Sequence, residues 1–191
     1  MGRAVTVCRE IPEHRALAHV LGLRCGNLRR QDRLEEAERC GAEAVQLLRT
    51  HRLTGIFSTV PLMEYADVTL ALLRRSRQPK DAVMDRAAKA VRQALKQGQR
   101  VHDEGAVESH RIEGEFKFLR GDLEGARKAW AHGLRRADEL GTLPARARIL
   151  ETRGRLCMQT GDIDEARRLF QQCELEQSCD ETDTVVKPSA I

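Results

Sequence analysis

Aromatic residues are scarce in this chain, where Phe, Trp and Tyr together make up only 3% of 191 residues. Aromatic and β-branched side chains are enriched in sheets, so their scarcity argues against a sheet-based core. Proline is rare as well, with five residues, and no run of about 18 consecutive apolar residues occurs. Residues 1–13 also lack the apolar stretch of a secretory signal. We therefore expect an α-helical protein without a membrane partner.

A block of charge of one sign is missing too. The chain carries 33 Lys and Arg against 29 Asp and Glu, a net charge of +4, and the two signs are intermixed along the sequence. Nucleic-acid-binding proteins more often gather their positive charge into a patch or a stripe. The charge pattern therefore does not favour a nucleic acid as the partner.

Motifs of catalysis and of metal binding are absent from the sequence. There is no phosphate-binding Gly-x-x-x-x-Gly-Lys-Ser/Thr loop, no Gly-x-Ser-x-Gly turn and no Cys-x-x-Cys pair. We therefore expect no enzyme activity, no cofactor and no metal, and reduced thiols in a cytoplasmic protein. A thiol-dependent enzyme stays open as an alternative, using Cys157, Cys173 or Cys179, although no base lies nearby in the sequence.

What the sequence does contain is a pattern that recurs at a fixed interval. The segments 121–126 and 161–166 share the order Gly-Asp, an aliphatic residue, an acidic residue, one variable residue and Ala, 40 residues apart. Related sequence patterns occur at 33–37 and, with a weaker match, around Ala87. Self-similarity at such a period predicts a stack of two-helix units, each burying its apolar face against its neighbours. Further residues keep the interval: Gly114 with Gly154, and Trp130 with Phe170.

Four units are expected, and their apolar periodicity predicts two helices in each. The units span 14–55, 58–105, 106–141 and 144–175. The predicted helices cover 14–30, 33–52, 58–77, 82–101, 106–119, 122–140, 145–159 and 162–175. Asp32 is expected to cap the second helix, and Gly105 to close the fourth. Glycines are expected in the turns at 121 and 161 and after the helix that ends near 140.

The two ends of the chain fall outside this array. Residues 176–191 are acidic and then polar, so we expect a disordered tail. Residues 4–11 resemble the end of the helix at 136–140. Two interpretations of residues 1–13 stay open: the remnant of a preceding helix in a larger array, or an ordinary disordered start.

These residues resemble tetratricopeptide repeats over most of the chain. That family places a small residue midway along each first helix, a turn residue before the second helix, Ala in the second helix, and a large apolar residue one turn later. The matching positions are Cys25, Gly114 and Gly154; Asp32, Gly121 and Gly161; Ala37, Ala87, Ala126 and Ala166; and Val91, Trp130 and Phe170. Gly41 departs from the last requirement, and the aromatic residue usual in the first helix is missing. The resemblance implies an all-α, right-handed superhelix of about four helix pairs.

A period near 40 and long second helices are similar to a subset of these repeats. That subset is attached to large signal-transduction ATPases, nucleotide cyclases and transcription regulators. The resemblance implies a scaffold that binds a peptide or a helix in its concave groove. The alternative it implies is a sensory or structural fragment that stacks on the rest of such a regulator.

First-helix residues are the candidates for lining that groove. We expect the partner-binding residues to be Arg111, Glu115, Arg148, Glu151 and Arg155. Their alternating charges have a second interpretation, in which they pair between adjacent helices as exposed ion pairs worth about 0–1 kcal/mol each. An Asn of the kind used to clamp a terminal carboxylate is lacking at these places, which argues against that mode of binding.

Overall fold

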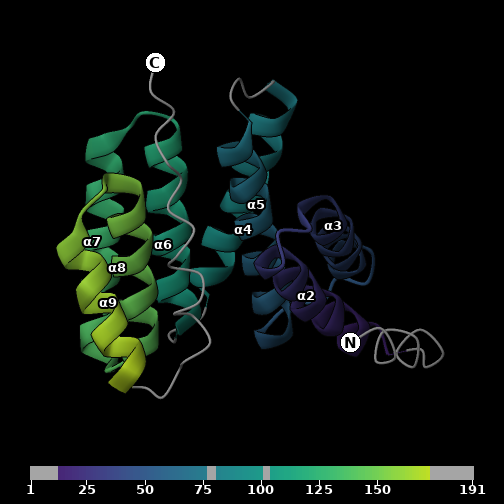
Figure 1. The fold of residues 1–191 in the computed structure, drawn as a ribbon. Helices are drawn as coiled ribbons and strands as arrows, with labels where there is room; N and C mark the ends of the chain where they lie inside the picture. The colour runs from purple at the N-terminus through teal and green to yellow at the C-terminus, as the bar shows by residue number, and fades with distance from the viewer. Residues whose placement is uncertain (1–12, 77–80, 101–103, 173–191) are drawn as a thin grey trace.

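A computed structural model describes residues 13–76, 81–100 and 104–172, and these residues form an all-α fold (Figure 1). Eight α-helices and one short 3-10 helix follow one another, with no strand in the described ranges. The α-helices are α2 (His14–Arg30), α3 (Leu34–Thr50), α4 (Thr59–Arg75), α5 (Asp81–Gly98), α6 (Glu104–Leu119), α7 (Leu123–Leu140), α8 (Leu143–Cys157) and α9 (Thr160–Gln172), and η1 (Ile56–Ser58) precedes α4.

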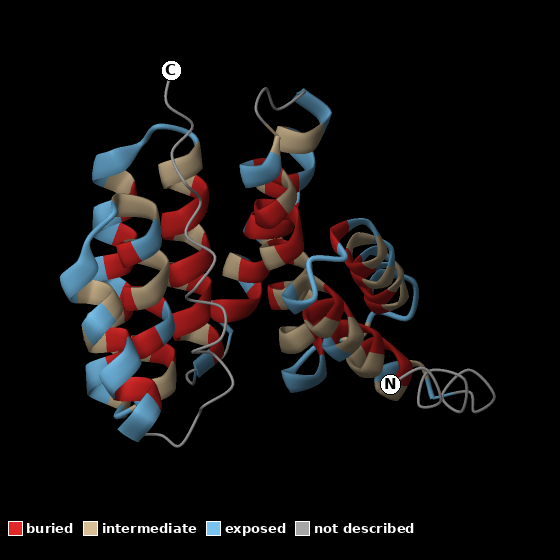
Figure 2. Cartoon of the chain, viewed as in Figure 1, coloured by how far each residue is buried: buried red, intermediate tan, exposed pale blue. Residues whose placement is uncertain are grey.

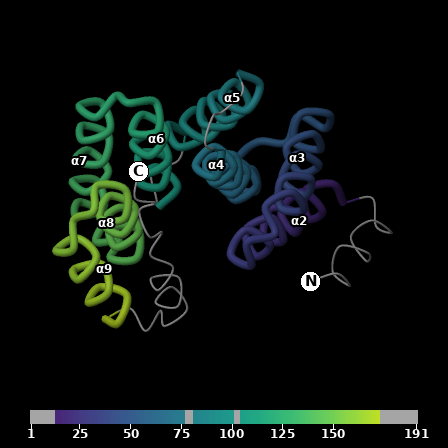
Figure 3. Tube along the Cα trace, turned by 45° about the horizontal axis from the view of Figure 1, so that its top comes forward, coloured from purple at the N-terminus to yellow at the C-terminus, as the bar shows by residue number. Residues whose placement is uncertain are grey.

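The helices are arranged as consecutive pairs. Each first helix packs on the helix that follows it: α2 on α3, α4 on α5, α6 on α7, and α8 on α9. The first helices also contact one another in order, α2 with α4, α4 with α6, and α6 with α8. Figure 3 shows the pairs following each other along a bent path, with α4 between α2 and α6. The eight described helices therefore form four consecutive pairs.

Small aliphatic residues let the helices pack closely. Ala37, Ala87, Ala126 and Ala166, the four repeat alanines, are at most 1% exposed. Figure 2 shows buried residues on the faces that the helices turn toward one another and exposed residues on the outer sides of α7 and α9. The four repeat alanines are therefore packing residues.

The turns between paired helices are partly as predicted. Gly121 has φ 81° and is followed by Asp122, whose side chain accepts a hydrogen bond from the backbone N–H of Gly125. Gly141 ends α7 with φ 64°. Asp32 occupies the position equivalent to Gly121, with φ 56°. It therefore replaces the turn glycine, as the repeat alignment predicts.

Three turn predictions are wrong. Asp32 does not cap α3, because the N-cap residue is Arg33 and no side chain caps it. Gly105 lies buried inside α6 instead of closing α5. Gly161 lies inside α9, because the reversal occurs three residues earlier at Met158, whose φ is 55°. Helix α9 begins before its Gly-Asp pair, whereas α7 begins after the same pair. The sequence pattern is therefore shared by the two units, but its position relative to the helix differs.

The contact between the small residue and the large ring is made in two ways. A Cβ added to Gly114 would lie 2.2 Å from Nε1 of Trp130, so this glycine gives the ring its place. In the first pair the equivalent ring position is Gly41. A Cβ there would lie 2.7 Å from Cδ2 of Tyr65 and 2.9 Å from Sγ of Cys25. The ring missing from α3 is therefore supplied by α4.

The central helix of the array is also its most apolar one. Among the described residues, Ile56–Arg75 is long and apolar enough to cross a membrane by length and composition. The buried core helix of a folded domain passes the same test, and α4 packs against α2, α3, α5 and α6. The absence of a membrane partner stays a prediction. Predictions for residues 1–12, for the 173–191 tail and for Cys173 and Cys179 lie outside the described residues.

Candidate functional site

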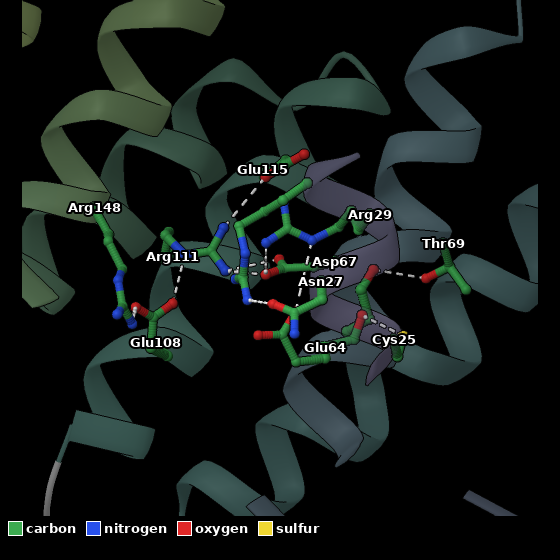
Figure 4. Close-up of polar contacts among 12 residues, drawn as sticks. Cys25, Asn27, Arg29, Glu64, Asp67, Thr69, Glu108, Arg111, Glu115 and Arg148 are labelled. Atoms are coloured by element: carbon green, nitrogen blue, oxygen red, sulfur yellow. Dashed lines mark hydrogen bonds and ion pairs between the residues drawn. The ribbon is translucent and has the colours of Figure 1, made fainter. Parts of the chain in front are cut away.

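Charged side chains converge on one face of the first helices, at the joints between successive pairs (Figure 4). We call this group the ion row. Its eight members are Arg29 on α2, Glu64, Asp67 and Arg74 on α4, Glu108, Arg111 and Glu115 on α6, and Arg148 on α8. Four arginines thus face four carboxylates, so the row is neutral as a whole.

Arg111 is the centre of the ion row. Its Nη2 lies 2.7 Å from Oδ1 and 2.8 Å from Oδ2 of Asp67, a two-oxygen contact that joins α6 to α4. Its Nε donates to Oε2 of Glu108 at 2.5 Å, and its Nη1 lies 3.6 Å from Oε2 of Glu115. The residue is only 8% exposed. Buried guanidinium groups need several hydrogen-bonded partners of this kind.

The row continues in both directions from Arg111. On one side, Nη1 of Arg148 lies 3.0 Å from Oε1 of Glu108, which joins α8 to α6. On the other side, Arg29 lies 3.6 Å from the carboxylate of Glu64 and 3.8 Å from that of Asp67, which joins α2 to α4. The ion row therefore crosses every joint between the four first helices.

Burial and ion pairing act in opposite directions on the pKa values of the row. Burial alone would raise the pKa of Asp67, but Arg111 and Arg29 outweigh it and hold that pKa below its usual value. The pKa of Glu108 is lowered in the same way by Arg111 and Arg148, against its burial. Burial raises the pKa of Glu64, and the opposing effect of Arg29, 3.6 Å away, does not offset it. The neighbouring arginines therefore favour the ionised forms of Asp67 and Glu108.

The predicted groove residues fall into two groups. Arg111 and Glu115 are 8% and 3% exposed, so the expectation that they form an exposed surface is wrong. The alternative that such residues pair between adjacent helices is confirmed for Arg111 and Arg148. Arg111 and Glu115 are buried because α4 packs directly against α6.

The second group lies on α8 and is more accessible. The side chain of Arg148 is 51% exposed, and that of Arg155 is 34% exposed. Nη2 of Arg155 lies 2.8 Å from Oε1 of Glu151, one helical turn earlier on the same helix. These side chains lie beside each other on one helix, where an incoming partner can reach the two arginines.

Sequence reasoning missed the members of the row on α2 and α4. Glu64 and Asp67 are two acidic residues within the most apolar helix of the chain. A carboxylate in such a segment has to find a cation when the helix is buried. Their presence in an apolar run was the signal that could have identified them.

The described thiols do not have the lowered pKa of a reactive cysteine. Burial raises the pKa of the Cys25, Cys40 and Cys157 thiols, which is opposite to the shift of a reactive cysteine. No group of three or more His, Cys, Asp or Glu side chains within the described part of the chain could hold a metal ion.

No protein-family model matches the chain, and no curated protein matches its sequence. The functional argument consequently depends on the geometry of the chain's own residues.

Proposed function

We propose that this protein is a non-catalytic interaction scaffold that binds a peptide or a helix of another protein along its row of first helices. The observation that carries the proposal is the order of contacts, in which each first helix touches the next through the ion row. Such a row gives one continuous, pre-organised face. Pre-organisation lowers the entropic cost of binding because few side chains have to be fixed when the partner arrives.

Arginines on this face supply the groups for recognition. The side chains of Arg74, Arg148 and Arg155 are 40%, 51% and 34% exposed. Each is oriented by one carboxylate of its own protein, which leaves other N–H groups of its guanidinium for a ligand. The partner that fits is a segment with acidic side chains at intervals that match successive helices. Arg111 and Glu115 support this face from beneath instead of touching the partner.

The tetratricopeptide-like character of the array is part of this proposal. It is supported by the four helix pairs, by the buried repeat alanines, and by the left-handed turn residues Asp32 and Gly121. The right-handed superhelix belongs to the proposal as well. A sensory or structural piece of a larger regulator is the second form that such a scaffold takes, with another part of the same protein as its partner.

Thiol chemistry offers little support for an enzyme. The three described cysteines are free, and their pKa values are raised instead of lowered. A cytoplasmic location, where thiols stay reduced, fits this proposal. Labelling one cysteine far faster than the others would favour the thiol-dependent enzyme instead.

Selection from a displayed peptide library tests the binding face. Peptides selected on the wild-type protein should be rich in Asp and Glu. Arg148→Glu with Arg155→Glu should weaken the binding of these peptides by about tenfold or more. A matched control reverses Arg39 and Arg168, exposed arginines on α3 and α9 whose side chains bond only backbone carbonyls. Selected peptides that ignore the first pair of changes, or respond equally to both pairs, would contradict the proposal.

A further inference from the structure

A hollow lies on the opposite side of α6 from the ion row. Its volume is about 350 Å³, and it is open to solvent on one side. Residues 113, 116 and 117 of α6 line it, together with Arg120 just after the helix, whereas residues 108, 111 and 115 face the ion row, so the two surfaces lie on different sides of one helix. The other wall comes from α5, through Ala88, Val91, Arg92 and Leu95, and Asp122 stands at the edge.

The floor of the hollow is apolar and its rim is charged. Val91, Leu95 and Phe116 form an apolar surface between the two helices. Arg120 lies over the ring of Phe116, with its guanidinium carbon 5.6 Å from the ring centre. This contact holds a positive charge against the apolar wall. The hollow therefore pairs an apolar binding surface with a fixed cation.

The charged side chains on the rim differ in whether they already have an ion-pair or hydrogen-bond partner. Lys117 lies 2.7 Å from Glu113, and Asp122 accepts the cap hydrogen bond of α7. In contrast, no ion pair or side-chain hydrogen bond to another described residue holds the guanidinium groups of Arg92 and Arg120. Among the described residues, no carboxylate pairs with either of these two cations beside the apolar floor.

We propose that this hollow binds an acidic peptide segment whose one large apolar side chain enters between Val91, Leu95 and Phe116. Arg92 and Arg120 then bind the flanking carboxylates of that segment. The second carboxylate oxygen of Asp122 lies on the same rim and accepts a hydrogen bond from a peptide N–H group, whereas the two oxygens of Glu113 face Lys117 and His110. This mixture of donors and acceptors fits a peptide better than a fatty acid, which has no N–H to donate.

Fluorescence anisotropy with a fluorescein-labelled peptide, Gly-Asp-Glu-Phe-Glu-Asp-Gly, tests the site. Binding should fall by about tenfold or more in Arg92→Glu with Arg120→Glu, because two attractive contacts become repulsive. Ala88→Leu, which fills the hollow without changing its charge, should weaken the same probe. Replacing the phenylalanine of the probe with alanine, or its acids with amides, should also weaken it.

Matched variants separate this site from the ion row. Arg39→Glu with Arg168→Glu should leave the affinity unchanged. Arg148→Glu with Arg155→Glu should weaken the probe less than Arg92→Glu with Arg120→Glu does. A larger loss in the Arg148 and Arg155 variant would place the probe on the ion row and overturn the inference. No measurable binding to the wild-type protein, or displacement of the probe by dodecanoate at lower concentration than by unlabelled peptide, would overturn it too. Thermal melts of each variant verify that the fold is intact.

Discussion

The first helix pair and the third contact α4 from opposite sides, and they do so by different chemistry. Equivalent positions lie 89 residues apart, so Gly22 and Gly26 on α2 correspond to Arg111 and Glu115 on α6. A Cβ on Gly22 would lie 2.8 Å from Cα of Pro61, so α2 approaches the backbone of α4 directly. On the other side, Arg111 reaches α4 through the carboxylate of Asp67. The first joint thus combines close backbone contact with the ion pairs of Arg29, whereas the second depends on the buried charge of Arg111.

The same two pairs also differ in the source of the aromatic ring. The third pair is self-sufficient, since Gly114 on α6 accepts Trp130 from α7, and the indole Nε1 donates to the Arg111 carbonyl at 3.3 Å. The first pair lacks its own ring and receives Tyr65 from α4. The comparison shows that a repeat position specifies a volume to be filled. It does not specify which helix fills that volume.

Charge reversal at Arg111 is expected to have the largest effect on stability. Removing one partner of a buried ion pair costs about 3–5 kcal/mol, and Arg111→Glu also adds a fourth carboxylate beside Asp67, Glu108 and Glu115. The loss in free energy of unfolding should exceed that range, measured by urea denaturation. Arg148→Glu is the control, because its side chain is half exposed and should cost far less. Similar losses in free energy of unfolding in the two variants would show that the burial of Arg111 does not make its charge more important for stability than that of Arg148.

Removal of the indole ring is expected to come next. Trp130 is fully buried, so Trp130→Ala should cost about 3–5 kcal/mol. Tyr65→Ala should cost less, because that ring is only partly buried. Both costs follow from the midpoint of chemical denaturation. Equal costs would mean that Tyr65, which α4 supplies to the first pair, contributes as much to stability as Trp130 does in the third pair.

A graded loss of stability is expected in acid. The pKa values of Asp67 and Glu108 are held below their ordinary values of 3.8 and 4.5. Their contribution is therefore present above those values and is lost as the pH falls below them. Glu64 has a raised pKa and acts in the opposite sense, since its contribution is lost as the pH rises through its folded pKa. Urea denaturation at pH values from 6 to 3 should show a net fall in the free energy of unfolding. This fall should be smaller in Arg111→Met.

The smallest effect concerns the equivalent turn residues of the two pairs. Gly121 has φ 81°, so Gly121→Ala should cost about 1 kcal/mol, because a Cβ is unfavourable in the left-handed region. Asp32 has φ 56°, so Asp32→Gly should change the stability by less than about 1 kcal/mol, in the stabilising direction. Thermal melts of the two variants give both values. Destabilisation by Asp32→Gly would mean that the Asp side chain, near Arg75, matters more than the backbone.

Features that depend on local sequence were predictable. The bounds of α2, residues 14–30, are as predicted, and most other helix ends lie within three residues of the prediction. The buried alanines and the small residues of α2 followed from periodicity. Local signals are sufficient here because helix hydrogen bonds and capping connect residues only a few positions apart.

Features that depend on contacts between pairs were not predictable. Asp67 and Arg111 are separated by 44 residues, and only the packing of α4 against α6 brings them together. The same holds for Tyr65 beside Gly41. The exposed groove expected at Arg111 and Glu115 is a buried ion network because spacing alone does not give the depth of a helix face.

A double-mutant cycle between Asp67 and Arg111 tests most directly the central claim that buried charge fastens the joint between α4 and α6. The single variants Asp67→Ala and Arg111→Ala and the double variant are compared by urea denaturation. We expect a coupling energy of about 1.5–3 kcal/mol, with the double variant less destabilised than the sum of the two single ones. Additive effects, with a coupling near zero, would contradict the claim.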